Sequence, residues 1–220
     1  MAEIEARLRE VGRISARHVL VNVNHDGNCF FHALIRVAGP DVRNAVIGRF
    51  QIDTLTVPPI RQALAEAVLD HFIALNEKPE RDKELSLKSD PLAEILSAMS
   101  DLKPSTSGDE EGLLLAEQDR AKYRKLQPYQ QAVVESLARN HSWGWEAHAL
   151  TPFIACMLLR VRIAIIPESA DTQGRRILMP TQYFPDATGP AVLLYSRDVP
   201  GQPAHYMAVV DPSELQREKS

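Results

Sequence analysis

Cys29 is the residue of this chain whose setting best suits nucleophilic chemistry. A strand-like run, residues 19–23, leads into the polar turn 24–28, and Cys29 follows the turn directly. Apolar residues then recur at helical spacing up to Gly39-Pro40, a typical end of a helix. Unpaired N–H groups and the positive end of the dipole at a helix N-terminus favour a thiolate over a thiol. We therefore expect the pKa of Cys29 to be lowered, as it is in reactive cysteines.

The turn before Cys29 offers backbone donors for an oxyanion. Gly27 permits a tight backbone path, and Asp26 and Asn28 are residue types whose side chains bond to turn backbone. We expect the N–H groups of Asp26, Gly27, Asn28 and Cys29 to point where a tetrahedral oxyanion would form. One short segment could then supply both nucleophile and oxyanion hole. The alternative is a buried structural cysteine, because cysteine is among the most buried residue types.

A nucleophilic thiol also needs a base to accept its proton and return it to the leaving group. Histidine fits this role because its unperturbed pKa of about 6.5 lies near neutral pH. His32 follows Cys29 by three residues on the same predicted helix, and His205 heads an apolar strand after a loop rich in glycine and proline. Both stay open on this ground, with His205 favoured because such a position presents a side chain to a cleft.

Residues 26–34, Asp-Gly-Asn-Cys-Phe-Phe-His-Ala-Leu, closely resemble the Asp-Gly-x-Cys motif of the ovarian tumour (OTU) family of cysteine proteases, which remove ubiquitin from proteins. Two further segments resemble family motifs in the same order: Trp143-Gly144-x-Glu146 before an apolar helix, and His205-Tyr206 leading into an apolar strand. The resemblance implies Cys29 as nucleophile, His205 as base and Asp26 as the residue that holds the oxyanion turn. It also implies a papain-like α/β OTU fold, with a central sheet of mainly C-terminal strands between helical layers.

The residue that would orient His205 departs from the family pattern. Many OTU proteases carry Asp or Asn two positions after the histidine, where this chain has Met207, which cannot accept a hydrogen bond from an imidazole. Some members use a polar residue upstream of the cysteine instead. We therefore expect Asn22 or Asn24 to take this role, with Asp211 a poorer candidate because it lies far along the strand.

The implied function is that of a deubiquitinase, which hydrolyses the isopeptide bond after the C-terminal glycine of ubiquitin. We expect ubiquitin or polyubiquitin chains as partners, and Trp145 and Tyr206 as walls of the narrow channel for a Gly-Gly tail. At the position of His32 the family often has arginine, so groove shape or helix packing is expected to differ. Two rival functions stay open. One is a papain-like cysteine protease acting on another modifier or peptide. The other is a catalytically weak OTU-like adaptor that binds ubiquitin, which Met207 favours because it cannot orient the histidine.

The 220 residues suit one catalytic domain with an insertion. We assign residues 1–18 to an N-terminal amphipathic helix, 19–212 to the OTU-like domain and 213–220 to a polar tail. Within the domain, the charged helical segment 76–138 is expected to act as a ubiquitin-binding arm, as the variable helical region commonly does in the family. Its tip, residues 103–112, is the segment expected to be disordered. Further expectations are helices over 1–16, 58–75, 91–102 and 113–138, the last broken or kinked near Pro128. Segment 42–56 is expected to be irregular, with room for a short helix. Strands are expected over 161–166, 175–180, 190–195 and 205–210, and a loop over 197–204.

Composition narrows the class of protein further. The net charge of −4 argues against a broad basic surface for nucleic acid. Two cysteines are too few for a disulfide framework and suggest a reducing compartment, with Cys156 a small buried hydrophobe in an apolar run. No run is long enough for a membrane span, so we expect a cytoplasmic monomer, placed in a host cytosol if it is a secreted pathogen effector. The histidines beside Glu146 match no strong zinc spacing, and we expect neither metal nor cofactor.

Overall fold

The structure, a computed structural model, describes residues 1–97, 99–103, 112–139, 145–168, 177–179, 192–199 and 202–213. Its helices are α1 (Ala2–Glu10), α2 (Cys29–Val37), α3 (Pro40–Phe50), α4 (Val57–Asn76), α5 (Glu80–Ser89), α6 (Pro91–Ser97), α7 (Glu117–Tyr123), α8 (Pro128–Ala138) and α9 (Trp145–Leu159). Its strands are β1 (Val19–Val21), β2 (Ile163–Pro167), β3 (Ile177–Met179), β4 (Val192–Val199) and β5 (Gln202–Val210). The expected mixed α/β class is confirmed.

One mixed sheet carries the strands in the order β1-β5-β4-β2-β3. β2 and β4 are parallel, and the other neighbouring pairs are antiparallel. β1 pairs with β5 only from Val19↔Val210 to Val21↔Ala208, so the N-terminal half of β5 extends beyond its partner on this edge. The chain leaves β1 there and runs toward Cys29, and α2 packs against β5.

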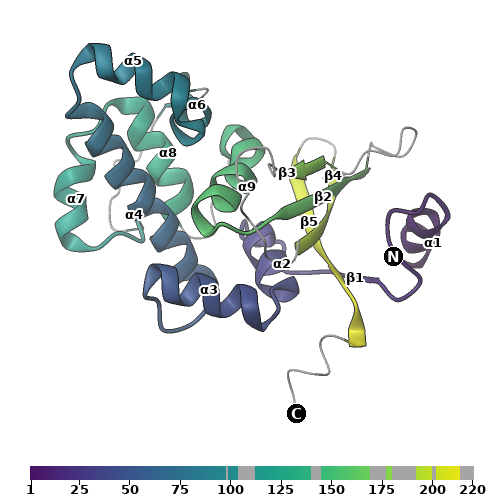
Figure 1. Cartoon of the computed structure of the whole chain (residues 1–220). Helices are drawn as coiled ribbons and strands as arrows, with labels where there is room; N and C mark the ends of the chain where they lie inside the picture. Colours follow the sequence, from purple (N-terminus) through teal and green to yellow (C-terminus); the bar gives the residue numbers. More distant parts are fainter. Residues whose placement is uncertain are drawn as a thin grey trace.

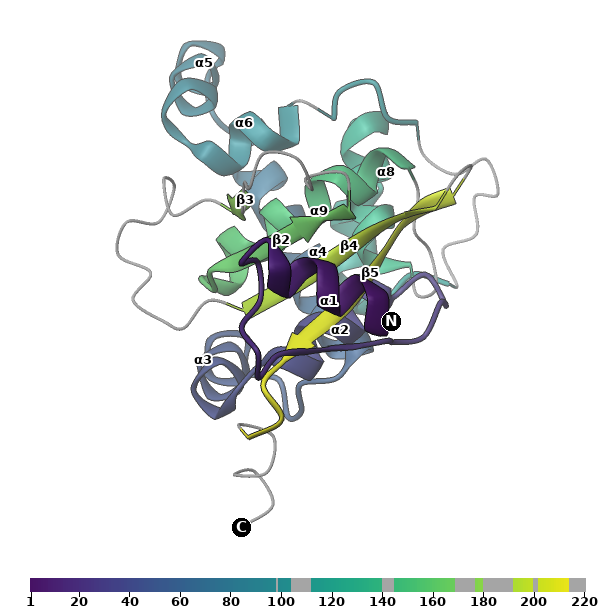
Figure 2. The ribbon, with the colours of Figure 1, turned by 90° about the vertical axis from the view of Figure 1, so that its right-hand side faces the viewer.

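Helices cover both faces of this sheet. α1 lies on one face, whereas α2 and α9 lie on the other, between the sheet and the remaining helices (Figure 1). The view turned by 90° shows α1 in front of the strands (Figure 2). The expected sheet of mainly C-terminal strands between helical layers is therefore present.

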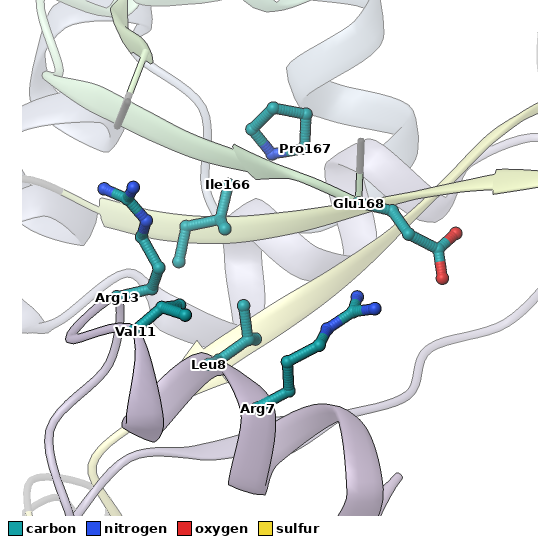
Figure 3. A pocket seen from close by; sticks show the side chains of 7 residues that line it. All are labelled: Arg7, Leu8, Val11, Arg13, Ile166, Pro167 and Glu168. Carbon is teal, nitrogen blue, oxygen red and sulfur yellow. The ribbon is translucent and has the colours of Figure 1, made fainter. Parts of the chain in front are cut away.

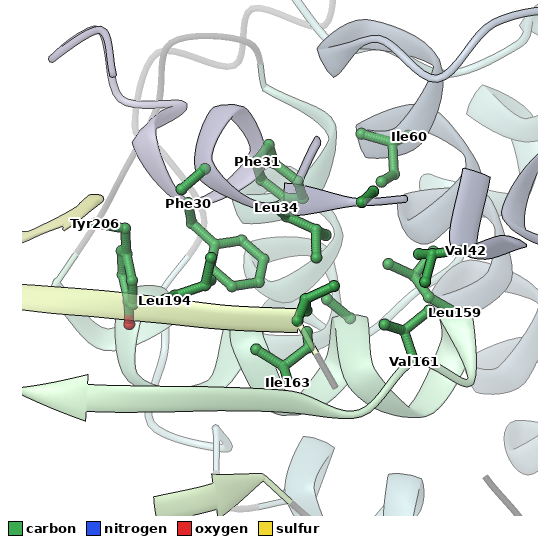
Figure 4. Packing of buried hydrophobic residues seen from close by; sticks show 14 of the residues in the cluster. Phe30, Phe31, Leu34, Val42, Ile60, Leu159, Val161, Ile163, Leu194 and Tyr206 are labelled. Atoms are coloured by element: carbon green, nitrogen blue, oxygen red, sulfur yellow. The ribbon is translucent and has the colours of Figure 1, made fainter. Parts of the chain in front are cut away.

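Helix α2 packs through its aromatic residues. Phe30 and Phe31 are both fully buried, and the ring of Phe30 meets those of Phe31 and Tyr206 edge to face, at centroid distances of 5.2 and 5.3 Å. Figure 4 shows Phe30, Leu34 and Tyr206 packed beside strand residue Leu194. Burying one such ring stabilises the fold by roughly 1.5–3 kcal/mol, so α2 is firmly attached to β5.

A second core joins the remaining helices. Its buried residues come from α4, α6, α7, α8 and α9 and from the segment before α7; examples are Leu69, Phe72, Leu96, Val133 and Ile154. α5 contributes no buried residue, which agrees with its charged sequence. The helices of segment 76–138 thus form a packed helical layer with α4 and α9.

On the opposite face, Leu8 and Ile14 anchor the N-terminal segment against Met207 and Val209 of β5. A small pocket opens where α1 meets the end of β2, lined by Leu8, Ile166 and Pro167 with charged residues at its margin (Figure 3). Among the described residues, no helix is both long enough and apolar enough to cross a membrane.

Several predicted boundaries are wrong. Segment 42–56, expected to be irregular with room for a short helix, belongs to α3 as far as Phe50, because Pro40 starts a helix instead of only ending the previous one. The expected break near Pro128 is present, since Pro128 opens α8 at its first turn and α7 ends before it. The predicted loop 197–204 is largely strand, since β4 runs to Val199 and β5 begins at Gln202. The expected disordered tip lies mostly outside the described residues.

Candidate active site

Cys29 occupies the first position of α2, where the predicted helix begins. Its side chain is 5% exposed and belongs to the core between α2 and the sheet. The backbone N–H of Tyr206 bonds to the sulfur, together with the N–H groups of Phe30 and of Cys29 itself. The thiol therefore lies against the uncovered edge of β5, one residue from His205.

The imidazole of His205 is held by Asn22. Nε2 of His205 lies 2.8 Å from Oδ1 of Asn22, a residue 183 positions earlier in the chain. An amide oxygen only accepts, so Nε2 carries the proton in the neutral ring and Nδ1 is left as the acceptor. A histidine in this tautomer can take a proton from a thiol through Nδ1. Of the two asparagines proposed for this role, Asn22 is the one bonded to His205.

A second imidazole covers the first. The rings of His25 and His205 stack with centroids 3.4 Å apart and planes inclined by 11°. His25 is exposed, whereas His205 is 3% exposed. The sequence indicated no role for His25; its place four residues before Cys29 was the only signal, and that spacing predicts no contact with a residue of β5.

The predicted lowering of the Cys29 pKa is wrong. Burial raises the pKa of the thiol and outweighs the backbone N–H groups of Tyr206 and Phe30, while the negative charge of Asp26 raises it further. Burial also lowers the pKa of His205 to about 4, with smaller contributions from His25 and Arg197. Both shifts favour the uncharged pair, so the resting site holds a thiol and a neutral imidazole. A general base that deprotonates the thiol during attack fits this state.

Asp26 shapes the turn before the nucleophile. Its Oδ1 accepts the N–H of Asn28 at 3.0 Å, and its Oδ2 lies 3.1 Å from Nε2 of His32. Gly27 between them has a φ of 76°, the left-handed region that favours glycine. The first of these bonds engages the N–H of Asn28, one of the four donors proposed for the oxyanion. His32 thus contacts the turn, and its ring is held by Asp26.

The remaining predicted site residues take different positions. Asn24 is exposed, and Asp211 bonds with Ser213 beyond the end of β5. The backbone N–H of Tyr206 bonds to the sulfur of Cys29, but Tyr206 is 4% exposed and its ring packs on Phe30 in the core. Trp145 begins α9, but its side chain is outside the described part of the structure. Within the described ranges, no group of three or more His, Cys, Asp or Glu side chains is placed to hold a metal ion.

Cys156 shows the features of a structural thiol. It is buried in the same core as Cys29, on the inner side of α9, and burial raises its pKa. Its sulfur receives the backbone N–H of Ile163. The predicted small buried hydrophobe fits this position.

Arg61 is a residue that the sequence did not single out. It is fully buried in α4 and donates from Nη2 to the carbonyl oxygens of Ser136 and Arg139 at the end of α8, at 2.9 and 2.5 Å. Its guanidinium also lies 4.8 Å from the centroid of the Phe31 ring. Burial lowers the pKa of Arg61 to about 10, which leaves it charged at neutral pH, and Asp26 partly offsets this shift. One cation thus links the helical layer to the nucleophile helix.

Comparison with known proteins gives little further information. No family model matches the chain, and no curated protein is significantly similar to it. Among solved structures, it is similar to the crystal structure of an OTU deubiquitinase from Wolbachia pipientis wMel, with 13% sequence identity and a TM-score of 0.41. That similarity covers 93% of this chain and 98% of the other. Similarity at this level carries no conclusion about activity.

Proposed function

We propose that this chain is a deubiquitinase of the OTU type. It would hydrolyse the isopeptide bond between the C-terminal glycine of ubiquitin and a lysine side chain. The observation that carries the proposal is the bond of 2.8 Å between Asn22 and His205, beside a cysteine at the start of a helix. The choice of ubiquitin as substrate depends on the motif resemblance of residues 26–34. A role as an effector in a host cytosol belongs to the same proposal.

The chemistry assigns one role to each group. Nδ1 of His205 takes the proton of Cys29 as the sulfur attacks the carbonyl carbon of the terminal glycine. Backbone N–H groups of the turn around Gly27 stabilise the oxyanion. The imidazolium returns the proton to the lysine nitrogen, the C–N bond breaks, and a thioester remains on Cys29. Water, deprotonated by His205, then releases the ubiquitin carboxylate and the free thiol.

One observation supports a second candidate, the catalytically weak ubiquitin-binding adaptor. The raised pKa of Cys29 and the low pKa of His205 both disfavour the ion pair of a highly reactive thiol. Binding of a ubiquitin tail could offset this by placing the carbonyl carbon at the sulfur, so that attack and proton transfer take place together. The two candidates therefore differ in whether Cys29 reacts once ubiquitin is bound.

Ubiquitin that carries a thiol-reactive electrophile at its C-terminus tests the proposal. We expect a covalent adduct, seen as a shift on a denaturing gel, with the wild-type protein and with Cys156→Ala. We expect none with Cys29→Ala, and slower formation with His205→Ala. No adduct from folded wild-type protein would refute the simple deubiquitinase. Binding of unmodified ubiquitin without adduct would favour the adaptor, and an adduct with another modifier's probe would favour the rival protease.

A further inference from the structure

The stacking of His25 on His205 has no part in the chemistry described so far. The ring of His25 lies flat on one face of the His205 imidazole at 3.4 Å, while Asn22 holds the ring edge through Nε2. His25 and Asn22 both belong to the segment between β1 and α2. This segment therefore contacts the base on a face and on an edge.

We propose that His25 is a positioning residue of the active site: its neutral ring holds His205 against Asn22, and its protonation switches the thiol–imidazole pair off. The proposal rests on Cys29 and His205 acting as nucleophile and base. His25 itself contacts neither the reacting bond nor the thiol proton in this scheme.

Positioning follows from the geometry of the stack. His205 is 3% exposed, and Asn22 holds one edge of its ring through Nε2. A flat aromatic ring at van der Waals distance restricts rotation of the imidazole about χ2. It also keeps water from one side of the bond between Asn22 and His205, and such a bond is stronger when it is shielded from solvent.

The switch follows from charge. His205 must become positively charged when it accepts the thiol proton. If His25 is already protonated, two cations face each other across 3.4 Å. Even at the dielectric constant of bulk water, that repulsion lowers the equilibrium constant for proton transfer about eightfold. The other charged or titratable groups nearby are Arg197 on β4, which also opposes the second charge, and Asp26 in the turn.

Alkylation of Cys29 by iodoacetamide tests the proposal without ubiquitin, so a failed ubiquitin assay leaves this test unaffected. Mass spectrometry of the Cys29 peptide separates its labelling rate from that of Cys156. His25→Phe keeps a flat ring but takes up no proton, whereas His25→Ala removes the ring. His18→Phe is the matched control, because His18 lies in the loop after α1 and bonds with Ser15.

At pH 7.5 we expect labelling within about twofold of wild type for His25→Phe, and at least about threefold slower labelling for His25→Ala. From pH 7.5 to 5.5, the ratio of the His25→Phe rate to the wild-type rate should rise by up to about eightfold, while the ratio for His18→Phe stays constant. Thermal unfolding of each variant verifies that the fold is intact. The proposal would be overturned if Cys29 of His25→Ala were labelled at the wild-type rate. It would also be overturned if the ratio of the His25→Phe rate to the wild-type rate did not change with pH.

Discussion

The bond between Asn22 and His205 yields the sharpest prediction. Asn22→Ala removes the acceptor 2.8 Å from Nε2 of His205 and nothing that is buried, because Asn22 is exposed and follows the last residue of β1. The free energy of unfolding should therefore fall by no more than about 1 kcal/mol, the net contribution of one hydrogen bond between neutral groups. The larger effect should be a slower reaction at Cys29, because the imidazole of His205 can then adopt the wrong tautomer and turn away from the thiol.

The size of that loss follows from the charge that His205 acquires. A hydrogen bond between neutral groups contributes about 1 kcal/mol net, and one to a charged group about 1.5–3 kcal/mol. Because His205 is neutral at rest and charged when the thiol is deprotonated, the bond to Asn22 stabilises the reacting state more than the resting state. The charged-group range corresponds to a fall in rate of about 10- to 150-fold.

Two companion variants make the test specific. Asn22→Asp places a carboxylate where the amide oxygen was; this favours the imidazolium and raises the pKa of His205 from about 4. We expect this variant to keep far more activity than Asn22→Ala. Asn24→Ala changes the other predicted candidate, which is exposed, and should stay within about twofold of wild type.

Initial rates of adduct formation with the ubiquitin electrophile, followed at pH 7.5, give the measurement. Iodoacetamide labelling of Cys29 in the same variants separates effects on the thiol from effects on ubiquitin binding. If Asn22→Ala reacts as fast as wild type, or Asn24→Ala is the slower of the two, Asn22 does not orient the base.

Three further predictions concern the surroundings of this pair. Arg61→Met should lower the free energy of unfolding by about 2–4 kcal/mol in urea titrations, because buried carbonyls at the end of α8 lose a charged donor; a change below about 1 kcal/mol would contradict the role of Arg61. Asp26→Ala should slow adduct formation about tenfold or more. Asp26→Asn should slow it less, because an asparagine side chain can still accept the N–H of Asn28. Equal rates for the two variants would count against a role for that hydrogen bond. The pKa of His205 is about 4 in the folded protein, against an ordinary value of 6.5. Between these two pH values the unfolded chain therefore binds more protons than the folded protein. Stability should therefore fall by up to about 3 kcal/mol from pH 6.5 to pH 4, and His205→Gln should remove that part of the slope in urea titrations at the two pH values.

Local rules made much of the nucleophile segment predictable. A glycine flanked by Asp26 and Asn28 indicates a turn, and the apolar spacing after it indicates a helix, so the position of Cys29 at a helix start needed no tertiary information. Helix boundaries at prolines were less certain. Pro40 and Pro128 both open helices here, and a proline after an apolar run is equally compatible with ending one.

The direction of the pKa shift of Cys29 could not be predicted in the same way. The helix N-terminus is a local feature and favours the thiolate, but burial depends on what packs over the thiol. β5 and the core beneath α2 leave it 5% exposed, and the cost of placing a charge there outweighs the local donors. The same burial acts on His205.

The sequence by itself determined a compact set of candidate residues, because Asn22, Asp26 and Cys29 lie within eight positions, and it also singled out His205 as a candidate base. Only the tertiary structure placed His205 against Asn22, 183 positions earlier in the chain, and not against Asn24, and stacked His25 on its ring. The physical reason is that backbone geometry depends on neighbouring residues, whereas contacts across the sheet depend on strand pairing and packing. β1 pairs with β5 and then ends, and that pairing decides which side chains meet at the thiol.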